Sequence, residues 1–218
     1  MKHPRELAAV MAASAAAVAV AASPAAAAPP TVIHVNNAAG AAYSGSVRLT
    51  LTSPVSVTTS LGTASCNRGN IDGTTTSSGA LTVSAYNFYN DPGPACTNSA
   101  GGSSTTTPVG LPWTGGDINW TGSAGTLRIN NMQVTSTSST IFGNIVCNYR
   151  GSGTGNSITM AVTNSTASTQ LKATATNISL TKVSSGSNIL CPSTATYSAG
   201  FDVNGLASGV YNVKLFLS

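Results

Sequence analysis

Hydrophobic and polar residues alternate with a period of two in many short segments of this chain. The segment SVRLTLT places Val47, Leu49 and Leu51 on one side, and SITMAVT and YNVKLFLS repeat the pattern. Successive side chains of a strand point to opposite faces, so this alternation is typical of strands with one buried face. We predict about ten to twelve such strands from the pattern.

The segments between these runs are rich in Gly, Ser, Asn and Pro, which supply turns. After the first 27 residues no window shows a capped apolar repeat of 3.6 residues, so little helix is expected. Many short strands with turn-rich connections predict an all-β fold, an antiparallel β-sandwich of the jelly-roll-like, double-sheet kind. The polar segment CTNSAGGSSTTTP, residues 96–108, is expected to form a loose loop.

Residues 1–27 have the pattern of a secretory signal peptide. Lys2 and Arg5 precede the apolar run LAAVMAASAAAVAVAA, and small residues follow it in ASPAAAAPP. Cleavage is predicted after Ala27 or one residue later. The apolar run is shorter than the ~20 residues of a membrane-spanning helix, and no second candidate follows it. The sequence therefore predicts a protein exported by the general secretory route, without a membrane span in the mature chain.

Residues 28–218 are predicted to form a single β-sandwich domain. CNRG at residue 66 and CNYRG at residue 147 form a weak internal echo, because each precedes a Gly/Ser/Thr loop, an alternating strand and another cysteine. A duplication would then relate residues 46–110 to residues 125–218. Chance similarity in so biased a composition is the competing interpretation.

Four cysteines, Cys66, Cys96, Cys147 and Cys191, occur in this exported chain. An even number of cysteines in an exported protein predicts two disulfides. Of the three pairings that four cysteines allow, the internal echo favours Cys66 with Cys96 and Cys147 with Cys191. A structural metal is less favoured, because the chain has no C-x-x-C spacing and keeps only His34 after the leader.

Charged residues are few, with 9 Lys and Arg against 5 Asp and Glu. The cations are spread singly along the chain, so the basic balance reflects a scarcity of acids rather than a cationic patch. Nucleic acid is therefore excluded as an expected partner.

Both tryptophans of the chain lie in VGLPWTGGDINW. If glycines 115–116 formed the turn of a tight hairpin, Trp113 would lie opposite Ile118 and Leu111 opposite Trp120, all on one face. A shared face of large apolar residues predicts core packing. A β-bulge at the glycines would reverse the parity of this argument.

The competing interpretation of these aromatic residues is a ligand-binding platform. The segment SAYNFYNDPG adds Tyr86 and Tyr89, so the candidate ligand-facing aromatics are Trp113, Trp120, Tyr86 and Tyr89. Adjacent aromatics at the end of a strand usually divide between the core and the surface, so a binding role is the less favoured interpretation of this segment.

Groups suited to acid–base catalysis are scarce in the predicted mature chain. It has no Glu, one histidine, no G-x-S-x-G elbow and no calcium-loop motif. The remaining acids are four aspartates, three of them in the turn-forming contexts IDG, NDPG and GGD: Asp72, Asp91, Asp117 and Asp202. We therefore predict no catalytic residue, no metal ligand and no cofactor, and keep a hydrolase with an Asp-only site as the weakest alternative.

The order of several short motifs resembles a known group of proteins. TSLGTASCN is followed by ACTNSAGG, GLPW, GTLRINNMQV, IFGNIVCNYRG and LCPSTATYSAGFDV. This order resembles small secreted β-sandwich proteins of actinobacteria of unknown function. It is more distantly similar to the secreted alkane-oxidation activator proteins of other bacteria, which share the cysteine-then-LPW arrangement. The resemblance implies an extracellular, non-enzymatic, surface- or matrix-associated protein, and it carries over no catalytic residue and no role with alkanes.

Three functional hypotheses follow. The first is a secreted, non-catalytic protein of the cell envelope or extracellular matrix, whose Ser/Thr-rich surface serves adhesion or self-association. The second is a carbohydrate-binding module that uses exposed aromatics on a cell-wall or extracellular polysaccharide. The third is the Asp-only hydrolase.

Overall fold

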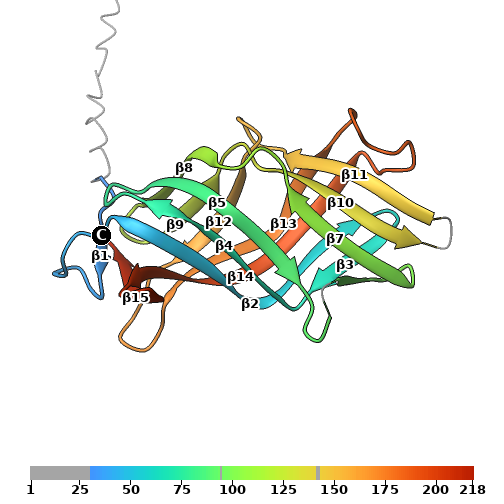
Figure 1. Ribbon diagram of the computed structural model, residues 1–218. Coiled ribbons are helices and arrows are strands. Elements are labelled where there is room, and N and C mark those ends of the chain that lie inside the picture. The colour runs from blue at the N-terminus through green and yellow to red at the C-terminus, as the bar shows by residue number, and fades with distance from the viewer. Residues whose placement is uncertain (1–29, 94, 141–142) are drawn as a thin grey trace, which may run out of the picture.

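We describe the fold from a computed structural model, which covers residues 30–93, 95–140 and 143–218. The predicted signal peptide, residues 1–27, lies outside these ranges. All regular secondary structure in the described ranges is β (Figure 1). The strands, in chain order, are β1 (Ile33–Val35), β2 (Gly45–Thr59), β3 (Gly62–Cys66), β4 (Arg68–Thr75), β5 (Ala80–Tyr89), β6 (Cys96–Asn98), β7 (Gly102–Pro108), β8 (Trp113–Trp120), β9 (Gly125–Ile129), β10 (Gln133–Thr140), β11 (Gly143–Gly151), β12 (Ile158–Thr163), β13 (Leu171–Val183), β14 (Thr194–Ala207) and β15 (Val210–Leu217).

The predicted all-β, antiparallel fold is confirmed, since every pair of neighbouring strands in the described ranges is antiparallel. The expected loose loop at residues 96–108 is wrong, because this segment forms the hairpin β6–β7 with Cys96 opposite Ser104. Its Ser/Thr run favours extended backbone, and a disulfide ties its first residue to β3. The 15 strands exceed the predicted ten to twelve, because β4, β6 and β7 lack strong apolar alternation.

The strands form one continuous sheet that closes on itself twice. β2, β14 and β13 run side by side as its long central strands. β2 pairs with β4 through its first half and with β3 through its second half, and β13 pairs in the same way first with β12 and then with β11. The sheet therefore forms two closed rings of strands, and in each ring the strands on opposite sides face one another across the core, as the two layers of a sandwich do.

Two rings result, and they share the three central strands. The first ring consists of β2, β4, β5, β8, β9, β12, β13 and β14, and the second ring of β2, β3, β6, β7, β10, β11, β13 and β14. In Figure 1 the first ring lies toward the left and the second toward the right. Each ring takes strands from residues 46–110 and from residues 125–218, so the two rings do not correspond to the two halves of the suggested duplication, which stays a prediction.

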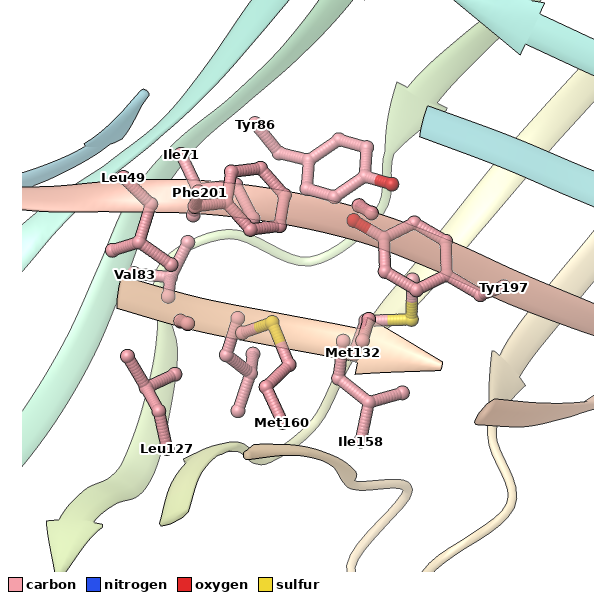
Figure 2. Close-up of a cluster of buried hydrophobic side chains, with 14 of the residues drawn as sticks. Leu49, Ile71, Val83, Tyr86, Leu127, Met132, Ile158, Met160, Tyr197 and Phe201 are labelled. Atoms are coloured by element: carbon pink, nitrogen blue, oxygen red, sulfur yellow. The ribbon is translucent and has the colours of Figure 1, made fainter. Parts of the chain in front are cut away.

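Large apolar side chains fill the first ring. Leu49, Ile71, Leu127, Met160 and Phe201 come from five different strands and meet in its interior (Figure 2). All are at most 2% exposed, as expected of strands that alternate between core and solvent.

Two tyrosines lie where the first ring meets the second. Tyr86 and Tyr197 direct their hydroxyl groups toward one another among these apolar side chains (Figure 2). Burial raises the pKa of both phenols above the ordinary 10.0, since the interior disfavours the charged form. The pair therefore stays neutral inside the core.

Both predicted disulfides are present with the predicted pairing. Cys66–Cys96 links β3 to β6, and Cys147–Cys191 links β11 to the loop between β13 and β14. Both bonds belong to the second ring, so the covalent bracing of the molecule is concentrated in one half.

Candidate functional site

The structure places Trp113 in the core. Its side chain is 1% exposed, its ring centroid lies 5.6 Å from that of Tyr86, and its indole Nε1–H donates to the carbonyl oxygen of Val109 at 2.8 Å. Tyr86 is 6% exposed. Neither residue can serve as a surface platform, so their assignment as ligand-facing aromatics is corrected.

The hairpin from which the core position of Trp113 was predicted does not exist. β8 runs without a turn from Trp113 to Trp120. Between the pairs Leu81–Gly116 and Val83–Trp113, β8 holds one residue more than β5, and Gly115 adopts a φ of 75°. This is the geometry of a bulge, and glycine tolerates the left-handed backbone without steric cost. Trp113 and Ile118 are an odd number of positions apart and would point to opposite faces of a regular strand. The extra residue reverses the alternation between them, so both side chains face the core from the same strand.

The other two candidate aromatics do not form a platform either. Trp120 is partly buried and packs against the core, and its backbone N–H donates to the Thr31 hydroxyl at 2.7 Å. Tyr89 is 39% exposed at the end of β5, and it is the only one of the four candidates with an exposed side chain. A single exposed ring gives the carbohydrate-platform hypothesis little support.

Each of the four candidate aspartates contacts a cationic side chain. Asp72 contacts Arg48 at 2.7 Å, Asp202 contacts Lys172 at 3.2 Å and Asp91 contacts Arg68 at 3.8 Å, while Asp117 pairs with Arg128. Three of the pairs join neighbouring strands at partly exposed positions, Arg48–Asp72, Asp117–Arg128 and Lys172–Asp202. His34 hydrogen-bonds the Gly40 carbonyl oxygen and the Ser218 hydroxyl. Within the described ranges no three His, Cys, Asp or Glu side chains gather as they would around a metal ion.

A pocket of about 240 Å³ opens in the second ring. Val57 of β2, Ala64 of β3, and Ile145 and Tyr149 of β11 form its apolar walls, with Leu61 and Pro192 also lining it. Sequence reasoning did not identify this pocket, because no motif marks its residues.

The space exists because small side chains occupy inward positions of the second ring. On β10, buried Val134 is followed along the inward face by Ser136, Ser138 and Thr140, all of which line the pocket. In the first ring, inward positions instead carry large apolar residues such as Ile71, Leu127 and Met160. In the sequence, small residues follow Val134 at every second position, but this spacing does not distinguish inward serines from surface serines.

The polar atoms around the pocket are largely engaged within the protein. The hydroxyls of Ser138 and Ser104 lie 2.7 Å apart, and the Thr59 hydroxyl donates to the Gly62 carbonyl oxygen at 3.2 Å. The Tyr149 hydroxyl donates to the Pro192 carbonyl oxygen at 3.1 Å, and burial raises the pKa of this phenol. None of the described lining residues carries a charge. The pocket therefore offers an uncharged, mainly apolar surface with a few hydroxyl groups.

The two disulfides hold the walls of the pocket. Cys147 is itself a lining residue, and its partner Cys191 fixes the neighbouring Pro192. The other disulfide joins Cys66 to Cys96. Cys66 is two residues from the lining residue Ala64, and Cys96 is two residues from the lining residue Asn98. The two disulfides therefore connect segments that carry lining residues of the pocket.

A second hollow, of about 600 Å³, is polar and lies on the outside of the first ring. Asp117, Asn119, Thr126, Arg128 and Thr159 of neighbouring strands line it. It has hydrogen-bonding groups that suit hydroxylated ligands, but no aromatic residue is among its described lining residues.

Comparison with known proteins identifies no relative. No family model matches the chain, and neither a curated protein nor a solved structure matches it. Among the described residues there is no helix with the length and apolar character needed to span a bilayer.

Proposed function

We propose that this is an exported, non-catalytic binding protein of the cell envelope or extracellular matrix that holds a small, uncharged, mainly apolar molecule in the pocket of the second ring. The pocket itself carries the proposal. It is a preformed, disulfide-braced hollow lined by aliphatic, aromatic and hydroxyl side chains, which is the usual composition of a small-molecule site.

The size of the pocket limits the ligand. An apolar cavity of ~150 Å³ holds one benzene molecule, which is about 25 Å³ per carbon atom. On that scale the 240 Å³ of this pocket accommodates about ten carbon atoms. The absence of charged lining residues among those described favours a neutral ligand, because a buried ionic group would lack a partner.

The sequence and the engaged polar groups support export and a non-catalytic role. The predicted leader and two disulfides are typical of proteins in oxidising compartments. The four aspartates contact cations, and His34 hydrogen-bonds a carbonyl oxygen and a hydroxyl. These contacts favour structural roles for the residues that an Asp-only hydrolase would need.

Calorimetric titration with 1-decanol tests the proposal, since this alcohol is neutral and has the predicted size. We expect saturable one-to-one binding that Ala64→Phe weakens at least tenfold by filling the pocket. Ser65→Phe is the matched control, because Ser65 is the next residue on β3 and does not line the pocket. Absence of saturable binding to the folded wild-type protein, or equal binding by the two variants, would refute the proposal.

Carbohydrate binding at the polar hollow is the second candidate function. The paired Asp117 and Arg128, with Asn119 beside them, present planar polar groups that suit sugar hydroxyls. Retention of the protein on cellulose, chitin or peptidoglycan that Asn119→Ala abolishes would favour this candidate over the apolar pocket.

A further inference from the structure

The loop between β13 and β14 exposes two consecutive aliphatic residues. Ile189 is 93% exposed and Leu190 is 56% exposed. Leu61, at the turn between β2 and β3, is 51% exposed. These are three of the six exposed large hydrophobic side chains among the described residues, and two of them are neighbours in the chain. Adjacent exposed aliphatic residues mark an interaction surface more often than single exposed residues do.

This loop is held in place. Cys191 is bonded to Cys147, and the Asn188 N–H donates to the Val146 carbonyl oxygen at 2.8 Å. The Asn188 side chain in turn accepts from the Leu190 N–H at 2.9 Å. The exposure of Ile189 and Leu190 is therefore imposed by the fold and is not a consequence of a loose loop.

One exposed residue lines the pocket, and the other two lie close in the chain to a lining residue. Pro192, two residues after Leu190, lines the pocket, and Leu61 lines it as well. Leu61 therefore stands at the pocket itself, and the exposed pair Ile189 and Leu190 comes directly before the disulfide-bonded Cys191 and the lining residue Pro192.

The charge distribution leaves this end free of acids. The aspartates Asp72, Asp117 and Asp202 lie on strands β4, β8 and β14 where these strands build the first ring. The backbone N–H of Asp91 donates to the side chain of Asn67, which follows β3, so Asp91 lies at the opposite end of β3 from Leu61. The Lys182 ammonium group donates to the Cys191 carbonyl oxygen at 2.9 Å and so places a cation beside the loop. No described carboxylate near the tip would repel an anionic surface.

We propose that Ile189, Leu190 and Leu61 form a docking tip that inserts into a lipid bilayer surface and brings the mouth of the pocket to the apolar phase from which its ligand is taken. This inference rests on the proposed function, because a neutral ligand of about ten carbon atoms concentrates in lipid rather than in water.

The area of the tip favours a lipid surface over a second copy of the chain. A stable protein–protein interface buries about 800 Å² on each partner, which three side chains do not provide. Reversible association with a bilayer needs only a small apolar surface at the headgroup boundary, assisted by attraction of cations to anionic lipids.

Sedimentation with vesicles of phosphatidylcholine and phosphatidylglycerol tests the docking. The processed, secreted protein is used, because the apolar leader would itself bind lipid. We expect the wild type to bind and Ile189→Ser/Leu190→Ser to lose at least about tenfold in partitioning, as removal of one or two inserted aliphatic side chains should do. Val210→Ser is the control, since Val210 is 57% exposed at the start of β15 in the first-ring half and should not change binding.

The two proposals fail in different ways. If docking is correct, the double variant still binds 1-decanol, and Ala64→Phe still binds vesicles. Vesicle binding by the double variant equal to that of the wild type would overturn the docking inference, whatever the result with 1-decanol. So would sedimentation equilibrium showing a dimer that the double variant dissociates, because the tip would then bind a second copy. Failure of 1-decanol to bind, with vesicle docking retained, would overturn the pocket function and leave the docking tip standing.

Discussion

Truncation of Trp113 to alanine should be among the most destabilising changes in the first ring. The side chain is 1% exposed, and a buried tryptophan removes about 150–250 Å² from water. At about 25 cal/mol per Å² this area corresponds to roughly 4–6 kcal/mol. The retained Cβ and partial collapse of the cavity lower the figure, so we expect a loss of about 3–5 kcal/mol.

Urea unfolding followed by far-ultraviolet circular dichroism measures this loss without depending on tryptophan fluorescence. Trp120→Ala serves as the internal comparison, because Trp120 is only partly buried and should cost less. A stability of about 5–15 kcal/mol makes both effects measurable. If Trp113→Ala cost less than about 1 kcal/mol, or less than Trp120→Ala, the burial argument and the bulge that directs Trp113 inward would both be wrong.

Two further predictions concern the second ring and the buried phenols. The double variant Cys147→Ser/Cys191→Ser should lower the free energy of unfolding by about 4 kcal/mol in the chain-entropy model, because the bond closes a loop with a sequence separation of 44. Denaturant titration of the variant against the wild type measures this loss. The pKa values of Tyr86 and Tyr197 are raised by burial, so the stabilisation that these neutral phenols provide is complete below pH 10 and is lost as the pH rises above it. Unfolding midpoints between about pH 9 and pH 11 should therefore fall less steeply in Tyr86→Phe/Tyr197→Phe than in the wild type, and parallel curves would contradict the burial effect.

Much of the fold could be predicted from alternation and cysteine spacing. Val47 and Leu49 are buried together as the pattern indicates, and the echo around Cys66 and Cys147 gave the correct disulfide pairing. β4 was missed because Ile71 is the only large apolar residue in RGNIDGTT, and its partners on both sides supply the pairing that its own sequence does not indicate.

The closure of the rings and the pocket could not be predicted. Pairing of β2 with β14 joins segments more than half the chain length apart, and local patterns carry no information about such contacts. The pocket depends on Ser136 and Ser138 facing inward where the first ring has aliphatics. In the sequence they are indistinguishable from the many serines on the surface, so only the three-dimensional arrangement identifies them.

The three strands common to both rings limit how this protein can change during evolution. β2, β13 and β14 each contribute one stretch to the first ring and another to the second, so neither ring can be inherited, exchanged or deleted as a module. An insertion within any of these strands would disturb both rings at once. Tolerated length changes should therefore concentrate in the hairpin tips, where backbone pairing ends. Under the proposed function, a new ligand preference at the pocket would arise by substitution of small inward residues, while the connectivity of the sheet stays fixed.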